Sequence, residues 1–93
     1  MAKLKSLDNK VVWITGASSG LGKALARECA LQGAQVVLTS RRYDELEAVR
    51  VGLLKPEQHL SIAADITDES QVRHAHEQVL ACKGRIDWLI NNA

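Results

Sequence analysis

Four short apolar segments alternate with three helical segments along this chain, and that alternation limits the folds open to it. The apolar segments are rich in β-branched residues and cover residues 10–15, 35–40, 59–64 and 87–91. Between them, apolar residues recur at helical spacing in residues 21–32, 43–54 and 68–83. Strands joined by helical crossovers run parallel, and such crossovers are right-handed in nearly all cases. The order βαβαβαβ therefore predicts an α/β fold with a doubly wound parallel sheet.

Packing and helix ends can also be predicted. Asp68 with Gln71 three residues later has the spacing of a capping box at the start of the third helix. Trp13 and Trp88 lie inside the first and fourth apolar segments, and we expect both to fill the core. We expect the first helix to pack through one apolar face formed by Leu21, Ala24, Leu25 and Cys29.

The composition excludes several functional classes. The 93 residues include 12 basic and 11 acidic side chains, a net charge of +1, which argues against a nucleic-acid-binding arm. No metal site is expected, since the two cysteines lack ligand spacing and His74 and His76 point in different directions on a helix. No apolar run approaches the ~20 residues of a membrane span, and the N-terminus lacks a signal peptide's apolar core. We therefore expect a cytoplasmic chain without nucleic-acid or membrane partners.

Three glycines in seven residues, Gly16, Gly20 and Gly22, join the first strand to the first helix. Glycine allows a positive φ or a close approach of backbone to ligand. The N-terminus of the following helix offers unpaired N–H groups and a partial positive charge, where a pyrophosphate would bind. Such a loop could serve only tight strand–helix packing. Its position after a buried strand and before a helix favours dinucleotide binding instead.

The end of the second strand indicates which dinucleotide is preferred. An acidic residue about 20 positions after the glycine loop would bind a ribose 2′-OH and select NAD. This chain has Ser40 there, followed by Arg41 and Arg42. Guanidinium groups offer bidentate donors to a 2′-phosphate, so the sequence predicts NADP(H) in preference to NAD(H). The alternative is that both arginines only solubilise the sheet edge, and the nearby Asp44 and Glu45 argue mildly against a phosphate site.

The segment Thr15–Gly22 resembles the Thr-Gly-x-x-x-Gly-x-Gly cofactor motif of the short-chain dehydrogenase/reductase family. Two further signatures follow in the family's order: Asp65-Ile66 after the third strand, and Asn91-Asn92-Ala93, which matches the start of the family's Asn-Asn-Ala-Gly motif. The resemblance covers nearly the whole chain. It implies a Rossmann-type sheet, incomplete at four strands, in the order 3-2-1-4. Residues 1–93 would form a single dinucleotide-binding unit that is truncated relative to the family.

The resemblance also implies roles for individual residues. Arg41 matches the family's NADP-selecting position, Asp65 the adenine contact, and Asn92 the cofactor ribose contact, whereas Asn91 serves mainly the sheet. Asp65 could instead only hold a turn, and the asparagines could only tie strands together. The candidate cofactor-binding residues are Gly16, Ser18, Ser19, Gly20, Leu21, Gly22, Arg41, Arg42, Asp65, Ile66, Asn92 and Ala93.

The family's chemistry depends on a Tyr-x-x-x-Lys pair and a serine, and this chain has no such pair. Its one tyrosine, Tyr43, is followed four residues later by Glu47. Without an acid/base pair there is no route for proton transfer, so no catalytic residue is expected in this chain.

Two functions are therefore open. The first is the N-terminal NADP(H)-binding part of an oxidoreductase that transfers a hydride between NADP(H) and a small carbonyl or alcohol substrate. The second is a non-catalytic dinucleotide-binding or interaction module, which could self-associate through Trp88, Leu89 and Ile90 on an unprotected fourth strand. The chain stops inside the Asn-Asn-Ala-Gly motif, and on that ground we expect a fragment.

Overall fold

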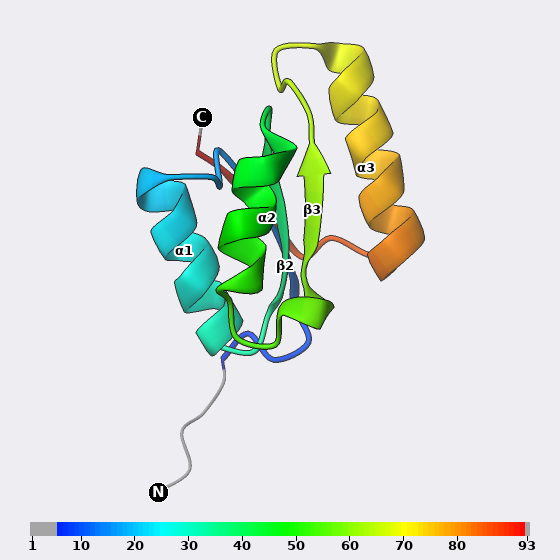
Figure 1. Ribbon diagram of the computed structural model, residues 1–93. Helices are drawn as coiled ribbons and strands as arrows, with labels where there is room; N and C mark the ends of the chain where they lie inside the picture. Colours follow the sequence, from blue (N-terminus) through cyan, green and yellow to red (C-terminus); the bar gives the residue numbers. More distant parts are fainter. Residues whose placement is uncertain (1–5, 93) are drawn as a thin grey trace, which may run out of the picture.

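The computed structural model describes residues 6–92, which form a parallel sheet flanked by helices (Figure 1). The elements are, in chain order, β1 (Val11–Thr15), α1 (Gly20–Leu31), β2 (Gln35–Ser40), α2 (Tyr43–Val51), the short 3₁₀ helix η1 (Pro56–Gln58), β3 (Leu60–Ala63), α3 (Glu69–Lys83) and β4 (Trp88–Asn91). All strand pairs are parallel, and the strand order is β3-β2-β1-β4. The predicted Rossmann-type α/β sheet with order 3-2-1-4 is confirmed.

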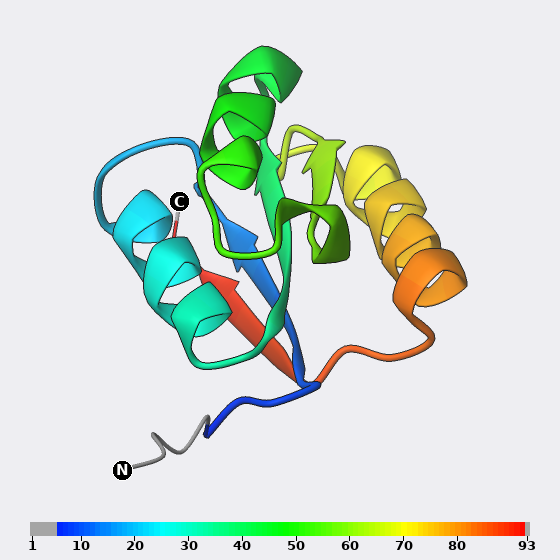
Figure 2. The same ribbon diagram turned by 60° about the horizontal axis from the view of Figure 1, so that its bottom comes forward.

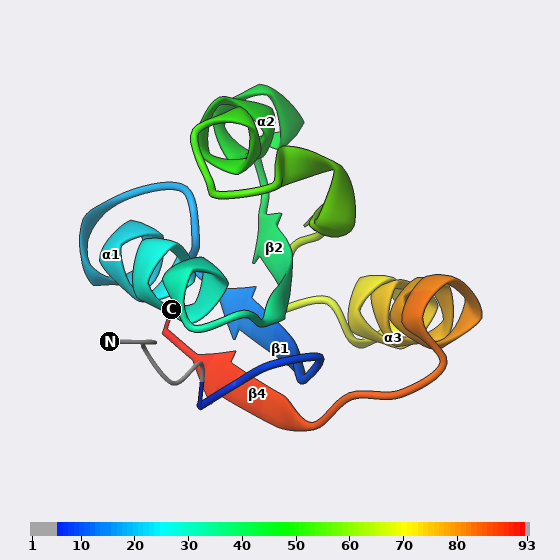
Figure 3. The same ribbon diagram turned by 90° about the horizontal axis from the view of Figure 1, so that it is seen from below.

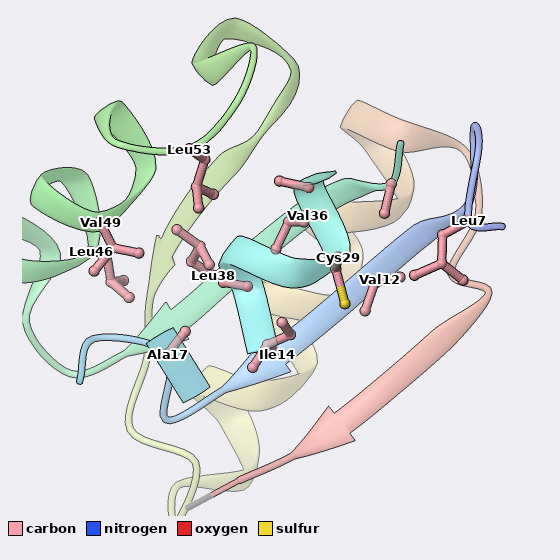
Figure 4. Close-up of a cluster of buried hydrophobic side chains, with 13 residues drawn as sticks. Leu7, Val12, Ile14, Ala17, Cys29, Val36, Leu38, Leu46, Val49 and Leu53 are labelled. Carbon is pink, nitrogen blue, oxygen red and sulfur yellow. The ribbon is translucent and has the colours of Figure 1, made fainter. Parts of the chain in front are cut away.

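The central strand β1 is buried on both faces because its alternating side chains enter two different clusters. Val12 and Ile14 pack with residues of α1, β2 and α2 (Figure 4). Val11 and Trp13 pack on the opposite face with residues of α3. Accordingly, α1 and α2 lie on one side of the sheet and α3 on the other (Figure 3). The expected core position of Trp13 is confirmed, and its indole N–H donates to Thr39 Oγ1 at 2.7 Å.

Helix α1 turns a different face to the sheet from the one predicted. Cys29 is buried as expected, but Leu21 is 65% exposed and Ala24 is also exposed, so the predicted face is wrong for these two. A Cβ on Gly22 would lie 2.0 Å from the carbonyl oxygen of Gly16, which shows how closely the start of the helix approaches the glycine loop. That approach selects small side chains, and the buried residues of α1 are Gly22, Ala26, Cys29 and Ala30.

Both outer strands begin one residue later than predicted, and in each case the preceding residue pairs through its side chain. Before β3, His59 Nδ1 accepts a hydrogen bond from the Val36 N–H at 3.0 Å. The imidazole must therefore be neutral and donate from Nε2 to the carbonyl oxygen of Leu54, 2.7 Å away. Before β4, the Asp87 carboxylate accepts from the Val11 N–H at 2.8 Å. Side chains thus extend the ladder beyond the backbone pairs.

The helix ends follow the local sequence. Helix α2 ends at Val51 rather than at Leu54, and its C-cap is Gly52, a residue with low helix propensity. At the start of α3, the Asp68 carboxylate accepts from the backbone N–H groups of Ser70 and Gln71, at 3.0 and 3.3 Å. This half of the predicted capping box is confirmed.

Strand β4 lies at the edge of the sheet, beside β1 (Figure 2). Trp88 is 52% exposed and Leu89 is 59% exposed, so the expected core position of Trp88 is wrong. The reason is topological: within residues 6–92, β4 has a neighbouring strand on one side only. Ile90 is partly buried against the cluster beneath α1.

Candidate functional site

The loops that follow β1, β2 and β3 meet at one edge of the sheet because parallel strands end on the same side. An open cleft of about 490 Å³ lies at this edge. It is lined by Gly16, Ser18, Ser40, Arg41, Arg42, Glu45, Ala64, Asp65, Ile66 and Thr67. Half of the predicted site residues are thereby brought together, namely Gly16, Ser18, Arg41, Arg42, Asp65 and Ile66.

The glycine loop runs from the end of β1 to the start of α1. Gly16 has a φ of +63°, and a Cβ at this position would lie 1.6 Å from the carbonyl oxygen of Asn92. Only glycine fits both constraints. The loop is also tied to the neighbouring strand, because the Ala17 N–H donates to the carbonyl oxygen of Thr39 at 3.2 Å. This fixed path sets the position at which α1 begins.

The first turn of α1 has no side-chain cap. Ser19 is the N-cap residue with extended backbone, but its hydroxyl accepts no hydrogen bond from the helix, and the first turn contains no acidic residue. The leading N–H groups of a helix need acceptors, and here no side chain supplies one at the cap. The remaining predicted loop residues, Ser19, Gly20, Leu21 and Gly22, lie at this helix start beside the cleft rather than in its lining.

Asn91, the last residue of β4, and Asn92, which follows it, hold the end of β1. Thr15 Oγ1 donates to Asn91 Oδ1 at 2.8 Å and accepts from the Asn92 N–H at 3.0 Å. The Asn92 side-chain amide donates to the carbonyl oxygen of Gly16 at 3.3 Å. Asn91 therefore holds the end of β1 through Thr15, and Asn92 holds both Thr15 and the glycine loop. Ala93, also a predicted site residue, lies outside the described residues.

Charges of both signs line the cleft. Arg42 Nε lies 3.8 Å from Glu45 Oε2, and the two side chains are 79% and 50% exposed. The Arg42 N–H donates to Ser40 Oγ at 3.3 Å. On the other wall, hydrogen bonds from the hydroxyl and the backbone N–H of Thr67 lower the pKa of Asp65, with a smaller contribution from the positive charge of Arg41. The carboxylate of Asp65 therefore stays ionised to a lower pH than that of an ordinary aspartate.

Four lining residues are absent from the predicted set: Ser40, Glu45, Ala64 and Thr67. Thr67 could have been found from its position two residues after Asp65, which is the spacing of an Asx turn. Ser40 and Glu45 are conspicuous in the sequence, yet which way Glu45 points depends on the angle at which α2 leaves β2. Ala64 carries no chemical signal.

Three further features of the described part of the chain concern metal binding, the tyrosine and membrane spans. No group of three or more His, Cys, Asp or Glu side chains among residues 6–92 is placed to hold a metal ion. Tyr43, at the first position of α2, is 51% exposed. None of the helices in this region has the length and apolar character needed to cross a membrane.

Known proteins are similar to this chain in both sequence and fold. A dehydrogenase/reductase SDR family protein 7-like from Anopheles gambiae is 45% identical over 96 residues, which covers 95% of this chain and 30% of that protein. A solved 3-ketoacyl-(acyl-carrier-protein) reductase from Brucella melitensis, complexed with NADH, is 39% identical with a TM-score of 0.84, covering 90% of this chain and 34% of that one. A hydroxysteroid dehydrogenase from Escherichia coli is 32% identical with a TM-score of 0.90, covering 96% and 38%.

The chain spans roughly a third of the length of each of these proteins. The sequence profile of the family described as short chain dehydrogenase matches residues 10–93, which include every strand and helix of the structure. With the glycine loop, the strand order and the profile in agreement, the chain belongs to the short-chain dehydrogenase family of oxidoreductases.

Proposed function

We propose that residues 1–93 act as one dinucleotide-binding unit, the amino-terminal NADP(H)-binding part of an oxidoreductase that transfers a hydride between NADP(H) and a carbonyl or hydroxyl substrate. One observation carries the proposal: an uncapped helix start after β1 and a pair of guanidinium groups after β2 flank the same cleft. NADP(H) has two separate anionic groups, a pyrophosphate and a 2′-phosphate, and these two features match them. The NADH complex of the similar reductase supports a nicotinamide dinucleotide.

The donor set of the cleft fits the parts of this cofactor in order. In the proposal, the pyrophosphate binds at the start of α1, through the segment that contains Ser18, Ser19, Gly20, Leu21 and Gly22. Arg41 and Arg42 bind the 2′-phosphate. Asp65 and Ile66 on the opposite wall contact the adenine, and Asn92 with Ala93 contacts a ribose of the cofactor. The bound cofactor supplies the hydride, while this chain's residues bind and orient it.

Proton transfer and substrate binding need groups that this chain does not supply. The chain covers about 30% of its curated relatives, so the proposal assigns the acid/base residues and the substrate pocket to a remainder of the protein.

Cys29 and Cys82 are free thiols in the structure, which fits a reducing compartment such as the cytoplasm.

The proposal is tested by titrating the chain with NADPH and with NADH and comparing an Arg41→Ala variant. One charge-assisted hydrogen bond contributes about 1.5–3 kcal/mol, so we expect NADPH binding to weaken at least tenfold and NADH binding to change less than twofold. Arg27→Ala is the matched control, because Arg27 is an exposed arginine on α1 that does not line the cleft. Equal losses for both cofactors would contradict the assignment of Arg41 to the 2′-phosphate.

A second function rests on the exposed edge of β4. Trp88 and Leu89 expose more than half of their surface there, which is unusual for large apolar side chains in a sheet. We propose that the isolated chain self-associates through this edge as an interaction module, independently of any cofactor. Sizing at high concentration should show a dimer or larger species, and Leu89→Lys should shift it to monomer. A monomeric wild-type chain at every concentration would remove this candidate.

A further inference from the structure

The cleft contains two arginines and two carboxylates, so the charges of its walls cancel before any ligand binds. A site that prefers a 2′-phosphate gains nothing from an acidic residue beside its cation. We infer that Glu45 is a specificity-determining residue that weakens the binding of NADP(H) relative to NAD(H), by competing with the 2′-phosphate for Arg42. The inference rests on the proposed function and refines it.

The position of Glu45 follows from the start of α2. Arg42 is the N-cap residue of this helix, and Glu45 lies three positions further on, in its first turn. Residues three apart on a helix are neighbours, which brings Glu45 Oε2 to 3.8 Å from Arg42 Nε. Both side chains line the cleft. The arginine is therefore already facing an anion at the place proposed for the phosphate.

The second carboxylate of the cleft has a different task. Asp65 Oδ1 accepts from the Thr67 N–H at 2.9 Å and from the Thr67 hydroxyl at 2.6 Å, so its orientation is set by its own turn. The hydrogen bonds of residues 6–92 include none to the Glu45 carboxylate. Glu45 is therefore the acid of the cleft whose carboxylate accepts no hydrogen bond from the described residues, and apart from the dipole of α2 its charge faces only Arg42 among them.

The charges of the two cofactors differ only at the 2′ position. A phosphate monoester carries about 1.5–2 negative charges at pH 7, so Glu45 repels it and neutralises part of the Arg42 charge. A free 2′-hydroxyl carries no charge, so Glu45 does not repel it. Glu45 should therefore penalise NADP(H) and leave NAD(H) unaffected.

The test is calorimetric titration of the 93-residue chain with NADP⁺ and with NAD⁺, compared between wild type and Glu45→Gln. We expect NADP⁺ to bind about fivefold more tightly to the variant, the upper range for an exposed ion pair, while the Kd for NAD⁺ changes less than twofold. The gain should shrink in 1 M salt, where screening acts over about 3 Å. Asp44→Asn is the matched control, since Asp44 is the other acid in the first turn of α2 and does not line the cleft.

The possible outcomes distinguish this inference from the proposed function on which it rests. A shift confined to Glu45→Gln and to NADP⁺ supports the inference. Equal effects of Glu45→Gln and Asp44→Asn, or equal effects on both cofactors, overturn it and leave the proposed function standing. Failure of both cofactors to bind the folded wild-type chain, with folding checked by circular dichroism, overturns the inference and the proposed function together.

Discussion

The two longer helices of this chain begin in opposite ways. At the start of α3, the Asp68 side chain accepts two backbone N–H groups, and Glu69 adds a negative charge to the first turn. At the start of α1, the Ser19 side chain accepts none, and the first turn contains no acid. Both helices follow a strand at the same edge of the sheet. Only α3 satisfies its first N–H groups with its own side chains.

This difference distinguishes a helix start that serves stability from one that is available to a ligand. A side-chain cap contributes about 0.5–2 kcal/mol, and α1 lacks that contribution although it carries a serine at the capping position. The rigid glycine loop, tied to Asn92 and Thr39, holds α1 in place instead. The first N–H groups of α1 are therefore held in position while no capping side chain accepts from them. They remain available to bind an anion.

The largest effect is expected from closing the approach between α1 and the glycine loop. In Gly22→Ala the new Cβ would lie 2.0 Å from the carbonyl oxygen of Gly16 and 2.8 Å from Asn92 Nδ2, so the helix start must move. We expect the free energy of unfolding to fall by about 3 kcal/mol, measured by urea titration.

The matched control is Gly84→Ala at the C-terminal end of α3. Unlike Gly22, Gly84 has a positive φ, but nothing lies within 4 Å of its Cβ position, so the loss should be limited to about 1 kcal/mol of backbone strain. Similar losses for both variants would show that α1 does not depend on close packing at its start.

An intermediate effect is expected at the caps themselves. Asp68→Ala removes the acceptor of the Ser70 and Gln71 N–H groups and should lower the free energy of unfolding by about 1–2 kcal/mol. Ser19→Ala removes a hydroxyl that caps nothing and should change stability by less than about 0.5 kcal/mol. Thermal and urea unfolding of both variants provide the comparison. A cost for Ser19→Ala as large as that for Asp68→Ala would contradict the difference between the two helix starts.

The smallest effect is a difference in pH response. The fold lowers the pKa of Asp65, before α3, below its ordinary value of 3.8, so its stabilisation is complete above that pH and is lost as the pH falls through the lower value. In an NMR titration, the Thr67 amide should report this low pKa, and Asp65→Asn should abolish the transition. The amides of Gly20 and Gly22 should show no such transition, because the first turn of α1 has no acid. A Thr67 midpoint at or above 3.8 would contradict the prediction.

The doubly wound parallel sheet could be predicted from the spacing of segments along the chain, whereas the strand order came from the family resemblance, and only half of the predicted site residues line the cleft. The alternation of apolar and helical segments sets the sheet, and parallel strands bring their carboxyl ends together. Which face α1 buries could not be predicted from hydrophobicity. Leu21 is more apolar than Gly22, but the distance between α1 and the loop admits only the smaller residue.

The sequence pattern also could not predict that Trp88 is exposed or that Glu45 lines the cleft. A tryptophan within an apolar segment is normally buried, yet its burial depends on which elements flank β4. Similarly, an acid in a first helical turn normally only complements the helix dipole. That Glu45 lines the cleft follows from where α2 stands relative to β2, which is a property of the assembled sheet.

The bond between Asn92 and Gly16 joins positions 76 residues apart, and this separation sets an order of events during synthesis. A ribosome adds about 5–20 residues per second, so the glycine loop exists for roughly 4–15 s before the asparagine that holds it has been made. During that interval β2 is synthesised, whereas β4, the other strand that pairs with β1, is not yet complete. The first segment of the site to be translated is therefore among the last to reach its final shape.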